Sequence, residues 1–353
     1  MAANYWESTQ RKHWQFTKDE LAAMRQALED EDPALVQMYP LPQLRHLNIY
    51  FNQQIIRLGK RLGVRQQALA TAQMYVKRFY TKIEIRRTNP FLLIATAVYL
   101  ACKMEETPQH IRLVGQEARS LWPGDIHLNN PGESTAKMGE CEFFLISEMQ
   151  SQLIIHQPYR TLTALQDTLG LHAEEAALAW SIINDHYMTD LPLLYPPHII
   201  ALTAILLAVV LKPTTQSNQN SQQQQQGDTN SAASRMAMPS NLAAAQASFA
   251  QLRAANQGPG VVGAPTPTLT PQNSGGLSGM AEGSGMENNS KKVPDQRWPK
   301  VSRIATWLAE SNIDIEAMVD CTQELISFYE VYESYNDKHT REQITRFIKA
   351  RGL

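Results

Sequence analysis

The feature that most constrains this chain is an apolar segment that occurs twice. Residues 90–103 read PFLLIATAVYLACK, and residues 197–210 read PHIIALTAILLAVV. Both begin with proline, which is favourable in the first turn of a helix, and both contain the ordered pattern T-A-V/I-x-L-A. Their small Ala and Thr residues allow neighbouring helices to approach closely. The pattern favours an internal repeat in which each copy is organised around one apolar central helix.

Helical periodicity extends on both sides of these two segments. Apolar residues recur every three or four positions over residues 44–62 and again over 69–83, and a loop at 122–132 precedes a further helix at about residues 136–153. Beyond a junction near Pro158, helices are predicted over residues 159–169, 173–189, 197–211, 301–307 and 313–332. No alternating pattern is long enough to form a sheet. The predicted fold class is therefore all-α, with two tandem five-helix repeats after an N-terminal helix.

A long polar segment interrupts the second repeat between its third and fourth helices. It consists mainly of Gln, Asn, Ser, Gly, Pro and Ala, and it includes five consecutive glutamines at Gln222–Gln226. So few large apolar side chains cannot offset the entropy lost on ordering, which predicts a disordered insertion. The predicted division is residues 1–40 for the N-terminal helix and linker, 41–155 for the first repeat, 156–212 for the first part of the second, 213–295 for the insertion, and 296–353 for the last helices and tail.

The composition excludes several functional classes. A net charge of −2 over 353 residues gives no global attraction to phosphate backbones or anionic lipids. The three cysteines, Cys102, Cys141 and Cys321, are far apart and lack a C-x-x-C spacing, so neither a disulfide framework nor a zinc site is indicated. The apolar segments are shorter than the ~18–20 residues that span a bilayer. We expect a soluble intracellular protein without metal or cofactor that binds neither membranes nor nucleic acid directly.

Catalytic motifs are absent from the sequence. It contains no Gly-rich phosphate loop, no H-E-x-x-H, no G-x-S-x-G and no kinase catalytic triplet. The basic clusters at residues 57–65 and 86–87 are typical of solvated helix ends, and contact with nucleic acid is the less favoured interpretation. We therefore expect no intrinsic enzymatic activity.

Two charged residues stand out because each lies on an apolar helix face. Lys103, in YLACKMEETP at residues 99–108, ends the first apolar segment where the second copy has Val210. Glu142 lies on the apolar stripe of the fifth helix of the first repeat. An unpaired inward charge is costly. Two alternatives are open: a local helix-surface pair between Lys103 and Glu106, or pairing of Lys103 and Glu142 with each other or with a docked partner.

These segments resemble the cyclin family. LACKMEETP is similar to the LA-x-K-x-EE helix end of the cyclin box, and two five-helix repeats match the cyclin fold. The junction HQPYRTL resembles that of transcriptional cyclins. The segments NYWESTQRKHWQFTKDEL and AWSIINDHYMTDLPLLYPPHIIAL are most similar to the Mediator-associated, cyclin C type. The resemblance covers the chain outside the insertion, which departs from the compact cyclin pattern.

The resemblance implies a set of kinase-binding residues. In this family, a lysine at the end of the third helix and a glutamate on the fifth together grip the partner kinase. These positions match Lys103 and Glu142, and Glu106 lies beside them. The N-terminal aromatic residues would add kinase specificity, because aromatic side chains anchor interfaces well; they are Tyr5, Trp6 and Trp14. Alternatively, the tryptophans cap the core of the second repeat.

The resemblance further implies a non-catalytic subunit that binds and activates a cyclin-dependent serine/threonine kinase of the Mediator kinase module. Such a protein would regulate RNA polymerase II transcription in the nucleus. A groove near Asn184, Asp185 and Tyr187 is implied as a contact for other subunits of the module. The alternatives are a nucleic-acid-binding relative of general transcription factor IIB, which would need a basic face, and a helical adaptor without regulatory effect.

Overall fold

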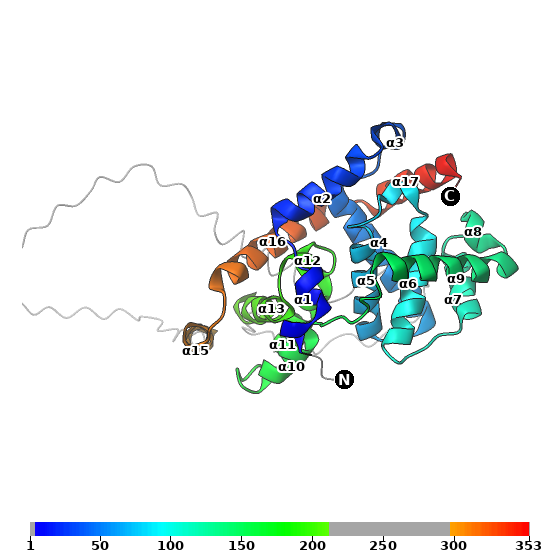
Figure 1. Ribbon diagram of the computed structural model, residues 1–353. Coiled ribbons are helices and arrows are strands. Elements are labelled where there is room, and N and C mark those ends of the chain that lie inside the picture. The colour runs from blue at the N-terminus through cyan, green and yellow to red at the C-terminus, as the bar shows by residue number, and fades with distance from the viewer. Residues whose placement is uncertain (1–3, 212–296, 353) are drawn as a thin grey trace, which may run out of the picture.

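The computed structural model describes residues 4–211 and 297–352, and every regular element in these two ranges is a helix (Figure 1). The predicted all-α class with two tandem five-helix repeats is confirmed. The predicted disordered insertion at residues 213–295 lies outside the described residues.

The helices follow one another in the predicted order. The first repeat contains α4 (Leu44–Leu62), α5 (Gln66–Phe79), α6 (Pro90–Met104), α7 (Ile111–Leu121), the short α8 (Ile126–Asn129) and α9 (Pro131–Glu148). The second contains α10 (Tyr159–Gln166), α11 (Ala173–His186), the short α12 (Leu191–Leu194), α13 (Pro197–Leu211), α15 (Arg297–Glu310) and α16 (Ile315–Ser334). Outside the repeats lie η1 (Tyr5–Glu7), α1 (Thr9–His13), α2 (Lys18–Asp30), α3 (Pro33–Met38) and α17 (Asp337–Arg351), and η2 (Ile85–Arg87) precedes α6.

The two apolar segments form the central helices of the two repeats. Helix α6 contacts α4, α5, α7 and α9, and helix α13 contacts α10, α11, α15 and α16. These neighbours occupy corresponding places in the order of the two repeats, as expected for an internal duplication. Asn89 caps α6 by accepting hydrogen bonds from the backbone N–H groups of Phe91 and Leu92. Val210, which matches Lys103 in the second copy, is half-buried.

The ends of α9 differ from the predicted helix at residues 136–153. The helix begins at Pro131, since proline is a favourable residue type in the first turn, and the Asn130 side chain caps the backbone. It ends at Glu148, because Gln150 and Ser151 adopt positive φ angles of 52° and 58°. The predicted loop therefore ends earlier than expected, and it follows a fourth helix, α7, that the periodicity analysis did not identify.

The terminal segments cover the two repeats. Trp14 and the α17 residues Ile344, Phe347 and Ile348 are buried with the first repeat, whereas Leu21 of α2 is buried with the second. In Figure 1, α2 lies alongside α16, and the Lys18 ammonium of α2 lies 3.1 Å from the Asp320 carboxylate of α16. The predicted domain limits stay a prediction, but both ends of the chain hold the repeats together.

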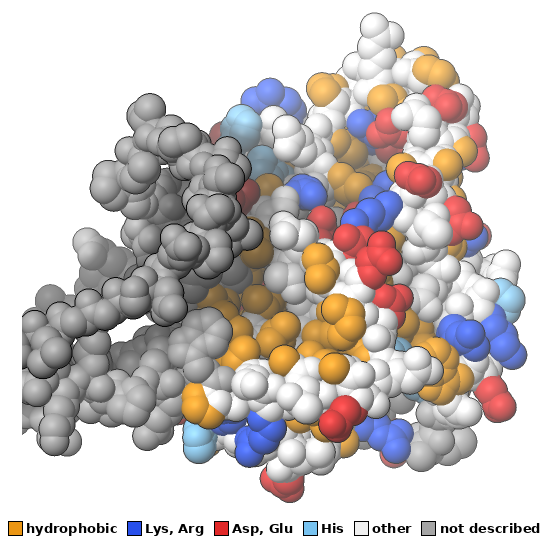
Figure 2. All heavy atoms as spheres, turned by 90° about the vertical axis from the view of Figure 1, so that its left-hand side faces the viewer, with side chains coloured by type: hydrophobic (Ala, Val, Ile, Leu, Met, Phe, Trp, Pro, Cys, Tyr) orange, Lys and Arg blue, Asp and Glu red, His pale blue; other side chains and the backbone are white. Residues whose placement is uncertain are grey.

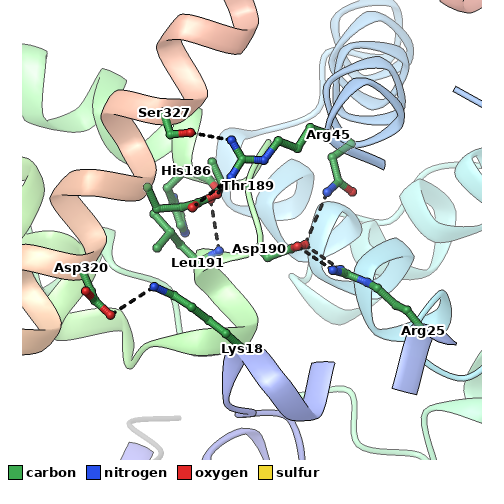
Figure 3. A network of polar contacts seen from close by, with 11 residues as sticks. Lys18, Arg25, Arg45, His186, Thr189, Asp190, Leu191, Asp320 and Ser327 are labelled. Atoms are coloured by element: carbon green, nitrogen blue, oxygen red, sulfur yellow. Dashed lines mark hydrogen bonds and ion pairs between the residues drawn. The ribbon is translucent and has the colours of Figure 1, made fainter. Parts of the chain in front are cut away.

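Asp190, in the turn after α11, is the centre of a polar network between these elements (Figure 3). The Arg25 guanidinium of α2 donates hydrogen bonds of 2.8 Å to both carboxylate oxygens, and the Asn48 amide of α4 donates one of 3.4 Å. Burial raises the pKa of Asp190, but the Arg25 hydrogen bonds and the Lys77 charge outweigh burial and lower it. A bidentate contact of this kind fixes the orientation as well as the position of the Asp190 carboxylate.

A second carboxylate, Asp185, is buried between α11 and α16. It accepts a 3.0 Å hydrogen bond from the Tyr329 hydroxyl. Burial raises the pKa of Asp185 to about 7, although the Tyr329 hydrogen bond acts in the opposite direction. In contrast to Asp190, which is bound by a guanidinium, Asp185 is bound by a neutral hydroxyl, so burial favours its neutral form.

We predict that Asp185 makes the stability of the protein depend on pH. Its folded pKa lies above the value of about 3.9 for an unfolded chain, so the native state binds the proton more tightly. The free energy of unfolding should therefore fall as pH rises from about 4 to 7, by up to roughly 1.4 kcal/mol per pH unit. Urea unfolding at several pH values should show this slope reduced in Asp185→Asn, whose amide oxygen still accepts from Tyr329. The same slope in both proteins would contradict the assignment.

Candidate functional site

The Lys103 ammonium and the Glu142 carboxylate form an ion pair between α6 and α9. The Lys103 side chain is 38% exposed, whereas that of Glu142 is 15% exposed. The ammonium also lies 4.5 Å from the ring centroid of Tyr99, one turn earlier on α6. Of the alternatives left open by the sequence, the structure shows Lys103 paired with Glu142. The half-buried carboxylate holds the ammonium at the surface, where the remaining N–H groups can reach a partner.

The end of α6 explains why Lys103 is presented at the surface. The backbone N–H of Thr107 donates to the Cys102 carbonyl at 2.9 Å, and that of Glu106 donates to Lys103 at 3.3 Å. These are the two bonds of a Schellman motif, with Glu106 in the left-handed conformation at φ 54°. The predicted site residue Glu106 is thus exposed beyond the helix, next to the ion pair.

Exposed apolar side chains adjoin both members of the ion pair in the sequence and also lie beyond the end of α9. Met104, which follows Lys103, is 41% exposed, and Phe143, which follows Glu142, is 79% exposed. Phe144 is 40% exposed, and Ile154 beyond the end of α9 is 55% exposed. Large exposed apolar side chains favour an interaction surface. We call Met104, Phe143, Phe144 and Ile154 the apolar surface of the ion pair.

Glu105 connects the end of α6 to α5 and to the junction between the repeats, a role that the sequence analysis did not identify. Its carboxylate accepts a 2.6 Å hydrogen bond from the Thr71 hydroxyl of α5 and a 3.4 Å one from Gln157 in the junction between repeats. The Gln157 amide also donates to the Gln67 carbonyl at 2.9 Å. The adjacent glutamates at the end of the helix could have indicated this role in the sequence. Neighbouring residues at a helix end point in different directions, so only one of the two can point back toward the helix bundle.

The N-terminal aromatic residues divide into exposed and buried positions. Trp6 is 52% exposed, and its ring lies 5.3 Å from that of His198 on α13. The Tyr5 hydroxyl donates to Gln15 at 2.8 Å, and its ring edge meets His156 in the junction. Trp6 and Tyr5 therefore lie over the boundary between the two repeats, with Trp6 available at the surface.

Trp14 is only 2% exposed and packs inside the protein. Its indole N–H donates to Gln152 at 2.6 Å, and the Arg78 guanidinium lies 4.9 Å from its ring centroid. The ring belongs to the core of the first repeat, so the alternative that it caps the core of the second is wrong for Trp14. A role of Trp14 in kinase binding stays a prediction. Because its ring is buried, the structure does not favour direct contact between this ring and a kinase.

The residues predicted to contact another subunit are mostly internal. Tyr187 is 1% exposed and packs in the core of the second repeat. Asp185 is buried against Tyr329, as described above, and Asn184 is half-buried and accepts a 2.7 Å hydrogen bond from the Tyr159 hydroxyl. Their predicted role stays a prediction, with Asn184 the most accessible of the three.

Within residues 4–211 and 297–352, no cluster of His, Cys, Asp and Glu has an arrangement that could hold a metal ion. None of the helices described there is both long and apolar enough to cross a bilayer. On the face in Figure 2, Lys and Arg side chains are interspersed with Asp and Glu side chains, and apolar side chains lie between them. That face presents no continuous basic surface of the kind that follows a phosphate backbone.

Comparison with known proteins agrees with this architecture. The family described as "Cyclin, N-terminal domain" matches residues 16–120. The RNA polymerase II holoenzyme cyclin-like subunit of Neurospora crassa is 63% identical, and the match covers 100% of this chain and 99% of that protein. The protein of the same name from Chaetomium globosum is 60% identical, with 100% of both chains covered.

A solved structure of the CAK complex from Chaetomium thermophilum bound to ATP-gamma-S contains a similar chain. The TM-score is 0.56 at 16% identity, with 99% of this chain and 88% of that chain covered, which supports the fold. The two fungal relatives match over the full length of the sequence, insertion included. The chain therefore belongs to the cyclin family, in the group of RNA polymerase II holoenzyme cyclin-like subunits.

Proposed function

We propose that this protein is the regulatory subunit of a cyclin-dependent kinase in the Mediator kinase module, and that it regulates RNA polymerase II transcription in the nucleus. The observation that carries the proposal is the Lys103–Glu142 ion pair within its apolar surface. The relatives' description as subunits of the RNA polymerase II holoenzyme supports the transcriptional setting.

The ion pair and the apolar surface suit the docking of a kinase helix. Phe143 and Met104 offer apolar area that loses contact with water on binding. Lys103 offers charged N–H donors to backbone carbonyls at the end of a docked helix, where the helix dipole is negative. Glu142 holds the ammonium in place, so less rotamer entropy is lost on binding. The two kinds of contact together would select one position of the kinase helix.

Activation would follow from that selection. A protein kinase is active only when its mobile helix is positioned so that a glutamate on it pairs with the lysine that binds the ATP phosphates. A subunit that binds this arrangement more tightly than the inactive one shifts the population toward it. The cyclin supplies no atom to the reaction, and it acts at a stoichiometry of one to one. Other subunits of the module would bind elsewhere, with the Asn184 region as the predicted contact.

We predict that Lys103→Ala and Glu142→Ala each abolish co-purification of the kinase. The circular dichroism spectrum should be unchanged, and the stability should change by no more than about 1 kcal/mol, because the pair is partly solvated. Lys137→Ala is the matched control, since Lys137 is a similarly exposed lysine, 36% exposed, paired with Glu140 on α9. Unfolding of both variants would show instead that the pair is structural.

We predict that the purified protein phosphorylates nothing alone and raises the activity of its partner kinase on addition. Phosphate transfer from labelled ATP to a serine/threonine substrate measures both effects. Kinase activity that survives stringent purification would overturn the non-catalytic role. Tight binding without a change in kinase rate would favour the adaptor alternative.

We predict that duplex DNA binds no more tightly than about micromolar at physiological salt, the range of non-specific binding. The net charge of −2 and the mixed charges in Figure 2 are the reasons. Fluorescence anisotropy with a labelled duplex provides the measurement. Tighter, sequence-dependent affinity would favour the alternative of a nucleic-acid-binding transcription factor.

A further inference from the structure

A cavity of about 480 Å³ lies between α2 and the first two helices of the first repeat, α4 and α5. This volume falls in the range of about 300–1,000 Å³ typical of small-molecule sites. Its walls include the apolar side chains of Phe51, Ile55 and Val76. Neither Lys103 nor Glu142 lines this cavity, so it is separate from their ion pair.

Buried polar groups without partners line this cavity. Lys77 is 7% exposed and Gln73 is 1% exposed, and both line the cavity from α5. Among the described residues, the Lys77 ammonium nitrogen and both polar atoms of the Gln73 side chain have no hydrogen-bond partner. A buried ammonium without a partner is costly, as is a buried amide. Burial accordingly lowers the pKa of Lys77 to about 8, although the Asp190 charge opposes this.

The other charges around the cavity are already paired. Arg25 donates hydrogen bonds to Asp190. Arg86 pairs with the Glu84 carboxylate at 2.5 Å and lies 3.9 Å from the Glu29 carboxylate. Within the described part of the chain, this leaves the Lys77 ammonium as the cavity cation without a direct partner. The cavity is lined by the cations Arg25, Lys77 and Arg86 and by the carboxylates Glu29, Glu84 and Asp190. A phosphate dianion would add two negative charges beside these carboxylates, whereas a monocarboxylate would add one, directly against the Lys77 ammonium.

We propose that the cavity binds a small amphipathic monocarboxylate, such as a medium-chain fatty acid. Its carboxylate contacts Lys77 and the Gln73 amide, and its apolar body lies against Phe51, Ile55 and Val76. Helix α2 forms one wall and is tied to the turn after α11 by Arg25 and Asp190 (Figure 3). Occupancy would therefore hold the N-terminal segment on the repeats. This inference does not depend on the proposed kinase partner.

The proposal is tested by titrating the full-length protein with decanoate. Calorimetry measures the binding, and thermal unfolding measures the effect on stability. We expect saturable binding and a rise in melting temperature, because a ligand of the native state stabilises it. Methyl decanoate has the same chain without the charge, and it should bind at least about tenfold more weakly, since an ammonium–carboxylate contact is lost.

Two variants locate the site. Lys77→Met keeps the length of the side chain, and Gln73→Leu keeps its approximate volume, so both should fold; each should weaken decanoate binding, Lys77→Met by about tenfold or more. Lys82→Met is the matched control, because Lys82 is an exposed lysine nearby in sequence that does not line the cavity. Its affinity should equal that of the unmodified protein.

Three results would overturn the proposal. The first is the absence of saturable decanoate binding up to about millimolar concentration, at which binding is too weak to be specific. The second is equal binding by Lys77→Met and the unmodified protein, and the third is equal binding of the methyl ester. Kinase co-purification should be unchanged in Lys77→Met, which separates this site from the proposed kinase surface.

Discussion

The structure depends on covering two helices that have almost no polar face. Helices α6 and α13 are apolar nearly all round, and an apolar surface left in water costs about 25 cal/mol per Å². Each is therefore enclosed by other helices of its own repeat. The third helix of each repeat takes the central position because its apolar residues extend around most of its surface.

The candidate site lies where one of these central helices reaches the surface. Helix α6 is buried along most of its length, but its last turn emerges at Lys103. The Schellman motif then directs the two following glutamates, Glu105 and Glu106, to different surroundings. Glu105 binds Thr71 and the repeat junction, whereas Glu106 stays exposed. A rigid buried helix thus positions a charged surface group, and the same helix end joins the two repeats.

The terminal segments do more than cover the repeats. The N-terminal segment contributes Trp14 to one core and Leu21 to the other, and α17 returns to the first repeat. Arg25 fixes α2 to Asp190, in the turn that follows α11. The cavity under α2 is a consequence of this arrangement, because a helix held at a few polar points does not fill all the space against the apolar faces of α4 and α5.

The sequence alone determined the fold class, the duplication and the two charges that stand out. Apolar periodicity and the repeated T-A-V/I-x-L-A pattern are local properties, so residues 90–103 and 197–211 could be identified as central helices without coordinates. Helix ends were less accurate at α9, because Pro131 suits the first turn of a helix as well as a loop. Only the tertiary structure decided that Lys103 meets Glu142 rather than Glu106, and that Trp14 is buried while Trp6 is exposed. Those outcomes depend on how helices distant in sequence pack, and periodicity assigns a residue to a face without specifying which element that face meets.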